Sequence, residues 1–217
     1  MRPDSPLCYE ARLGLGLNAL LAGLMLPAYA TLQWYLWVRS GSLPPPLHLL
    51  RAFELILPLS AALGAAHLML IEREEGFHEL RLSYPENRWR LPLLRTAWAL
   101  ALTLLGLAVG AVLFRLGYGP YPLDETVVPA LAPILALLGL SLLVGNLTGS
   151  YWVAAGAAMS WWLLDAVSRG TYTRLFFLFN ATWPCAGVDP TVNRWLLALL
   201  GLALLAVNAG LSARRTL

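Results

Sequence analysis

A run of 39 consecutive residues without a charged side chain or a histidine, from Thr126 to Leu164, most constrains what this chain can fold into. As a single α-helix the run would be about 58 Å long, nearly twice the thickness of the hydrocarbon core of a bilayer. The run must therefore form two membrane spans. Its only turn-like cluster lies between Asn146 and Tyr151, which predicts that the two helices are joined there.

The rest of the chain is similarly apolar. Of its 217 residues, 59% are hydrophobic and 12% are charged, whereas about a quarter of the residues in soluble proteins are charged. We expect an all-α integral membrane protein with six transmembrane helices in a single domain. The predicted spans are at about residues 13–38, 47–71, 93–115, 127–146, 151–168 and 194–213.

One long charged block, in the loop at residues 72–92, separates the second and third predicted spans. Within it, Gly76 separates a short helix from the preceding span, and Pro85 forbids its extension. Between these two residues, Phe77, Leu80 and Tyr84 recur at helical spacing on one face. We expect a water-exposed loop whose short helix docks on the membrane or on a soluble partner.

The residue order of the block resembles a known pattern. From Glu72 to Trp89 it follows Glu-Arg-Glu-x-Gly-x-x-Glu-Leu-x-Leu-x-x-Pro-x-x-Arg-Trp, and so resembles the cytoplasmic loop after the second span in permeases of the type-2 ATP-binding-cassette (ABC) exporter family. In that family the loop carries a coupling helix that contacts the ATPase subunit. The resemblance implies that the coupling residues here are Glu72, Glu74, Glu75, Gly76, Phe77, Glu79, Leu80, Pro85 and Arg88.

The resemblance implies a permease subunit that works with an ABC ATPase subunit and with a second permease copy, either identical or a paralogue. All 15 basic residues are Arg, so the chain cannot form a Walker-A phosphate loop, which requires a lysine. We therefore expect a transporter subunit without its own ATPase site and without a cofactor of its own, since ATP and magnesium bind to the partner. The apolar, aromatic composition favours a hydrophobic substrate such as a lipid, a drug-like molecule or a peptide.

The distribution of arginines predicts the orientation. Nine arginines lie on the side of the two termini and six on the other side, and positive loops favour the cytoplasm. We expect a multi-pass protein of a bacterial or archaeal plasma membrane, surrounded by lipid, with both termini cytoplasmic. Spread over loops on both sides, the arginines do not indicate a nucleic-acid partner. Cys8 and Cys185 then lie on opposite faces and cannot pair with each other.

A second unusual stretch, residues 170–192, precedes the last span. Its aromatic part, Tyr172 to Phe179, is too short to cross a membrane, and Pro184, Gly187 and Pro190 interrupt the remainder of the stretch. We expect an outer re-entrant or interfacial segment. Type-2 permeases have broken, partly inserted helices at this place, so the resemblance extends to this segment.

Four polar residues in the predicted spans are candidates for a gate or a pore: Arg51, Glu54, His67 and Asp165. The simpler interpretation, which we favour, is a local ion pair between Arg51 and Glu54, three positions apart, with His67 packed and hydrogen-bonded. No catalytic or metal-binding motif is present in the sequence. Two alternatives are an intramembrane enzyme using Glu54, His67 and Asp165, or a haem-export permease.

Overall fold

The computed structural model describes residues 17–40, 51–68, 70 and 90–214, and every regular element in these ranges is helical. The long helices are α2 (Leu17–Ser40), α7 (Arg90–Tyr118), α9 (Val128–Thr148), α10 (Tyr151–Ser168) and α11 (Pro190–Arg214). A π-helical turn, η1 (Ala52–Ile56), continues directly into α4 (Leu57–Leu68), and two short elements complete the set: α8 (Leu123–Thr126) and the 3-10 turn η2 (Arg174–Phe176). The prediction of an all-α protein is confirmed.

Three stretches of helix among the described residues are long and apolar enough to cross a membrane: Leu93–Gly117, Leu123–Thr148 and Pro190–Ser212. The first lies in α7, the second joins α8 to α9, and the third lies in α11. The chain is therefore a transmembrane protein, as its composition predicts.

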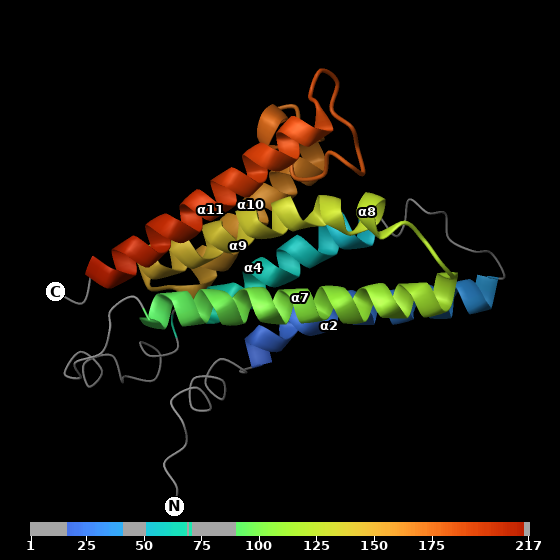
Figure 1. Ribbon diagram of the computed structural model, residues 1–217, viewed down its shortest axis with the longest axis horizontal. Coiled ribbons are helices and arrows are strands. Elements are labelled where there is room, and N and C mark those ends of the chain that lie inside the picture. The colour runs from blue at the N-terminus through green and yellow to red at the C-terminus, as the bar shows by residue number, and fades with distance from the viewer. Residues whose placement is uncertain (1–16, 41–50, 69, 71–89, 215–217) are drawn as a thin grey trace, which may run out of the picture.

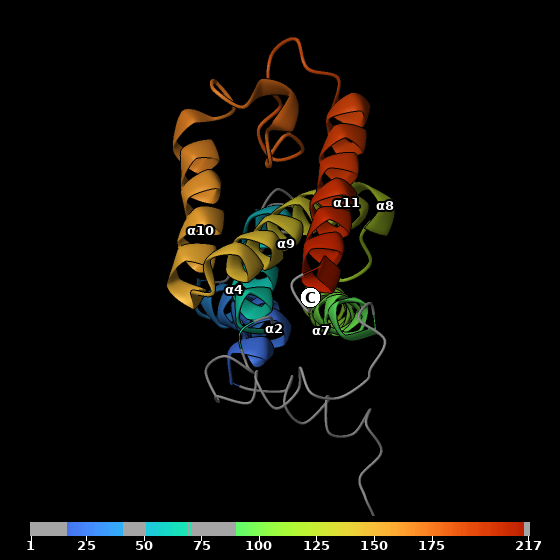
Figure 2. The ribbon, with the colours of Figure 1, turned by 90° about the vertical axis from the view of Figure 1, so that its left-hand side faces the viewer.

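Successive helices of the bundle run in alternating directions along its length (Figure 1). Helix α4 lies between the pair formed by α2 and α7 and the group formed by α9, α10 and α11. Seen from the end of the bundle, α9 occupies the middle, where it contacts α4, α10 and α11 (Figure 2). Apolar side chains from α2, α4, α7 and α9 form one buried cluster, and a second cluster joins α4 and α9 to α10 and α11.

The bundle has two distinct ends. We call the first the turn end. There α4 and α9 approach each other, because a methyl group added to Gly145 of α9 would lie 3.5 Å from the carbonyl oxygen of Ala66 in α4. Asn146, also in α9, donates to Oδ1 of Asn208 at 2.9 Å and to Oγ of Ser212 at 2.8 Å in α11. The connection from α10 to α11, residues 169–189, lies at the opposite end, which we call the cap end (Figure 1).

The turn predicted inside the uncharged run is confirmed. Helix α9 ends at Thr148, and Gly149 takes a left-handed conformation, with φ of 68°, as its N–H donates to the carbonyl oxygen of Gly145. Glycine adopts this conformation without steric cost, which is why it commonly follows a helix. Helix α10 then begins at Tyr151.

Helix α11 begins at Pro190, four residues before the predicted start of the last span. Oδ1 of Asp189 accepts hydrogen bonds from the backbone N–H groups of Thr191 at 2.7 Å and Val192 at 3.3 Å. Aspartate commonly caps helices in this way, and proline suits a first helical position because its missing N–H would have no partner there. The apolar run alone did not reveal this polar first turn.

Helices α9 and α11 cross at two glycines. A methyl group on Gly139 would lie 2.8 Å from the carbonyl oxygen of Gly201, and one on Gly201 would lie 2.5 Å from the carbonyl carbon of Leu135. Both distances are shorter than any normal contact, so only glycine fits at this crossing.

The proposed coupling helix and its nine coupling residues lie outside the described residues, because the description resumes at Arg90. Residues 13–16 of the first predicted span and residues 47–50, 69 and 71 of the second also lie outside it. The six-span count, the coupling helix and the insertion of residues 170–192 into a membrane therefore stay predictions.

Candidate functional site

Residues 169–189, which we call the cap segment, turn back over the cap end of the bundle (Figures 1 and 2). Two residues with positive φ, Arg169 at 50° and Gly170 at 81°, reverse the chain directly after α10. Phe177 packs against Gly170, where a methyl group would lie 2.8 Å from its ring carbon Cγ. Phe177, Leu178 and Phe179 are fully buried, so the segment contributes to the core.

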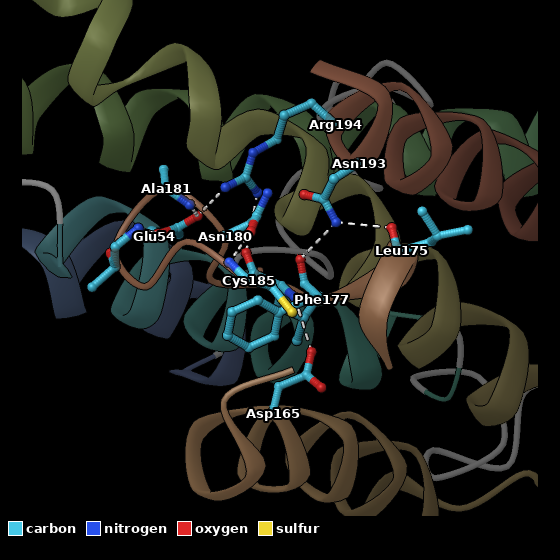
Figure 3. A network of polar contacts seen from close by, with 11 residues as sticks. Glu54, Asp165, Leu175, Phe177, Asn180, Ala181, Cys185, Asn193 and Arg194 are labelled. Atoms are coloured by element: carbon cyan, nitrogen blue, oxygen red, sulfur yellow. Dashed lines mark hydrogen bonds and ion pairs between the residues drawn. The ribbon is translucent and has the colours of Figure 1, made fainter. Parts of the chain in front are cut away.

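The buried carboxylate of Glu54 binds the middle of the cap segment. Its Oε1 accepts the backbone N–H of Ala181 at 3.0 Å, and its Oε2 accepts that of Thr182 at 2.6 Å. Arg194 of α11 forms an ion pair with the same carboxylate (Figure 3). The second nitrogen of this guanidinium donates to the carbonyl oxygen of Leu178 at 3.1 Å. One carboxylate therefore joins η1, the cap segment and α11.

Glu54 lies in the π-helical turn, and the sequence explains why the helix is irregular there. Pro58 has no N–H to donate to the carbonyl of Glu54 four residues earlier, and its ring would clash with that carbonyl in a regular α-helix. A π-helical turn relieves this conflict and commonly occurs at functional sites. The indole N–H of Trp162 in α10 donates to the carbonyl oxygen of Leu55 at 2.8 Å, which satisfies one acceptor of the irregular turn.

Asp165 of α10 holds the beginning of the cap segment. It is fully buried, and its two oxygens accept the hydroxyl of Thr173 at 2.7 Å and the backbone N–H of Leu178 at 2.8 Å. Asn193 of α11 acts from the other side, since its amide nitrogen donates to the carbonyl oxygens of Leu175 at 2.8 Å and Phe177 at 3.0 Å (Figure 3). Three helical elements thus bind the backbone of one irregular segment through polar side chains.

Of the four predicted polar residues, the structure brings three to the cap segment: Glu54 and Asp165 through hydrogen bonds, and Arg51 through the ring of Trp183. Glu54 and Asp165 both bind the cap segment, although they contact different parts of it. His67 lies near the other end of α4, 13 positions from Glu54, which corresponds to about 20 Å along a helix. The three residues of the hypothetical intramembrane enzyme are therefore not assembled into one site.

The local ion pair between Arg51 and Glu54 was the wrong interpretation. Glu54 pairs instead with Arg194, 140 positions away in sequence. The carbon Cζ of Arg51 lies 6.0 Å from the ring centroid of Trp183 in the cap segment. The physical reason is competition, because Arg194 and two backbone N–H groups already surround the carboxylate.

Sequence reasoning did not select the residues that complete this network, namely Arg194, Asn193 and Asn180. Oδ1 of Asn180 accepts the backbone N–H of Cys185 at 2.9 Å and shapes the far half of the cap segment. The available signal was the polar pair Asn193-Arg194 at the start of an apolar run, since polar groups next to a span need buried partners.

The polar side chains of this site attach the cap segment to the surrounding helices. Both buried carboxylates already accept hydrogen bonds, and the described residues contain no group of three or more His, Cys, Asp or Glu side chains that could hold a metal ion. Charge-assisted hydrogen bonds in a low-dielectric setting are strong, and breaking them exposes unpaired buried charge. The site therefore holds the cap segment against the bundle.

No protein-family model, no curated protein and no solved structure matches this chain.

Proposed function

We propose that this chain is the transmembrane permease subunit of an ATP-driven ABC exporter of the type-2 class. Two permease copies form the translocation pathway, and two separate ATPase subunits drive it. The observation that carries the proposal is the charged block from Glu72 to Arg90, whose residue order resembles the coupling loop of that class. The block lies between two helices of a transmembrane bundle, where a coupling loop is required.

The directions of the helices support this assignment. The last turn of α4 leads into the block, and it lies at the turn end together with the α9–α10 turn and the final residues of α11. A six-span topology with α2, α4, α7, α9, α10 and α11 as its spans agrees with their alternating directions (Figure 1). In this proposal the turn end is cytoplasmic, as the excess of arginines on that side favours.

The proposed location is the plasma membrane of a bacterium or archaeon, with both termini in the cytoplasm. In the type-2 family the dimer seam involves the first and fifth spans, which are α2 and α10 here. Both helices present large apolar side chains on their outer faces, including Leu32 and Leu36 of α2 and Leu163 and Val167 of α10. A second permease copy or membrane lipid has to cover these faces.

In the proposed cycle, the cap segment forms the outer gate. ATP binding to the partner moves the coupling helices, and the bundle shifts between inward-open and outward-open states, as two-state elements do. The Glu54–Arg194 pair stabilises the state in which the cap segment lies against α4 and α11. The substrate is a hydrophobic molecule such as a lipid, a drug-like compound or a peptide.

The test is to purify the tagged full-length chain from its own host and to look for a copurifying subunit with a Walker-A motif. Phe77→Ala and Leu80→Ala remove the apolar anchors of the proposed coupling helix, and Glu79→Arg reverses its docking charge. We expect each variant to reach the membrane normally but to lose the ATPase subunit or its substrate-stimulated hydrolysis.

The matched control is Glu125→Arg, a charge reversal of the same size at an exposed position of α8. It should leave copurification and hydrolysis unchanged. Wild-type copurification and hydrolysis in all three coupling variants would overturn the assignment.

A further inference from the structure

A cluster of two arginines and one tryptophan at the cap end has no role in the network around Glu54. The guanidinium carbon of Arg51 lies 6.0 Å from the ring centroid of Trp183, and that of Arg169 lies 5.8 Å from the same centroid. Arg51 directly precedes η1, Arg169 directly follows α10, and Trp183 lies in the cap segment. We call Arg51, Arg169 and Trp183 the arginine–tryptophan cluster.

Neither arginine of the cluster has a carboxylate partner within the part of the chain that the structure describes. The two buried carboxylates at this end are occupied: Glu54 by Arg194 and two backbone N–H groups, and Asp165 by Thr173 and Leu178. A guanidinium cation is attracted much less strongly to an indole face than to an anion. Two guanidinium charges beside one ring are therefore incompletely neutralised.

Several buried polar atoms without hydrogen-bond partners in the described part of the chain belong to the cluster or to residues within three positions of it in sequence. Nε of Arg51, Oγ of Ser168, Nδ2 of Asn180 and Oγ1 of Thr182 are buried, and none has a hydrogen-bond partner among the described residues. Ser168 precedes Arg169, and Thr182 precedes Trp183, so these donors adjoin the cluster in sequence. Asn180 and Thr182 are at most 5% exposed. Buried donors normally have partners, so these four atoms, one of which belongs to Arg51 itself, indicate a ligand that accepts hydrogen bonds.

An apolar surface of α10 immediately precedes Arg169 of the cluster in sequence. Leu163, Leu164 and Val167 are exposed along the last turns of α10, and Val167 is 81% exposed. Val167 is three or four positions from the two leucines, so the three side chains lie on neighbouring parts of one helix surface. Arg169 follows two residues later, where α10 ends. A hydrocarbon chain on this surface would place its polar head beside the arginine.

We propose that the arginine–tryptophan cluster binds the phosphate of an anionic phospholipid whose acyl chain lies along Leu163, Leu164 and Val167. Guanidinium groups match phosphate oxygens through paired N–H donors, and the indole is amphipathic, as residues at a membrane interface commonly are. The bound phosphate, with its single negative charge, offsets part of the positive charge of Arg51 and Arg169 and joins η1 to the end of α10. This lipid site is independent of the ATP-coupling block.

The test uses the purified full-length chain in detergent and native mass spectrometry. The probes are phosphatidylglycerol, diacylglycerol with the same acyl chains, and inorganic phosphate. We expect the wild-type chain to retain phosphatidylglycerol and to release diacylglycerol. Arg51→Gln and Arg169→Gln should each weaken the retention about tenfold, as loss of one charge-assisted contact does, and Arg51→Lys should retain more lipid than Arg51→Gln.

The matched control is Arg115→Gln, which removes an exposed arginine near the end of α7, outside the cluster. It should retain phosphatidylglycerol as the wild type does. Unchanged gel-filtration profiles establish that the variants are folded. Equal lipid retention in both glutamine variants and the wild type would overturn the site. Equal retention of diacylglycerol, or displacement of the lipid by the same concentration of inorganic phosphate, would overturn the phospholipid assignment.

Discussion

The carboxylate of Glu54, in a π-helical turn, and the guanidinium of Arg194, in the second turn of α11, form a buried ion pair over the cap end of the bundle. The side chain of Glu54 is fully buried, and that of Arg194 is 16% exposed. Because the same carboxylate also accepts two N–H groups of the cap segment, this pair links the stability of the bundle to the position of the segment.

Removing one partner of this pair should strongly destabilise the protein. We expect Arg194→Leu to lower the free energy of unfolding by about 3–5 kcal/mol, because it leaves the buried carboxylate without its cation. The double variant Glu54→Gln/Arg194→Leu should lose less than the sum of its single variants. The measurement is thermal or denaturant unfolding in detergent, arranged as a double-mutant cycle.

The control for this cycle is Asp124→Asn, at an exposed position in α8, which should change stability by less than about 0.5 kcal/mol. Strictly additive effects of the Glu54 and Arg194 substitutions would show that the two residues are not coupled in solution.

Asp165→Asn should loosen the beginning of the cap segment without unfolding the bundle. An asparagine has only one acceptor oxygen for the two donors, Thr173 and Leu178, and it removes the negative charge that strengthens both hydrogen bonds. We expect a cost of about 1–3 kcal/mol and faster proteolysis at the exposed residues around Tyr172. Thr173→Val should have a smaller effect, because the remaining carboxylate oxygen still binds Leu178. Proteolysis of the Asp165→Asn variant at the wild-type rate would argue against this role.

Gly201→Ala should separate α9 from α11. The added methyl group would lie 2.5 Å from a backbone carbon of Leu135, where no flexible side chain can move aside. We expect a loss of stability of at least about 1–3 kcal/mol, as overpacking typically causes. Gly210→Ala in the same helix is the control, since nothing lies within 4 Å of its new methyl group. Equal melting temperatures for the two variants would contradict the close crossing.

The two cysteines test the proposed topology. The thiol of Cys185 is partly exposed in the cap segment, and Cys8 lies outside the described residues near the N-terminus. A membrane-impermeant thiol reagent added to sealed cells should label Cys185, whereas Cys8 should react only after permeabilisation. Single-cysteine variants, Cys8→Ser and Cys185→Ser, separate the two signals. Labelling of Cys8 from outside would refute the six-span orientation.

The extent to which the sequence predicts this structure differs from element to element. The turn at Gly149 was predictable, because helix length, hydrocarbon thickness and a local cluster of polar and small residues all required it. The Glu54–Arg194 pair was not, because sequence spacing reports only neighbours on the same helix. The choice of partner for Glu54 depends on how the cap segment folds back, which involves Gly170 and the burial of Phe177.

The crossing of α9 and α11 at Gly139 and Gly201 limits how this bundle can deform. The two backbones are in direct contact at these glycines. If either helix slid along the other, residues with larger side chains would replace the glycines at the crossing and would clash with the opposite backbone. The close crossing therefore favours movement of the two helices together. Any hinge lies elsewhere, and the chain offers one candidate in the π-helical turn, where the regular hydrogen-bond ladder is already interrupted.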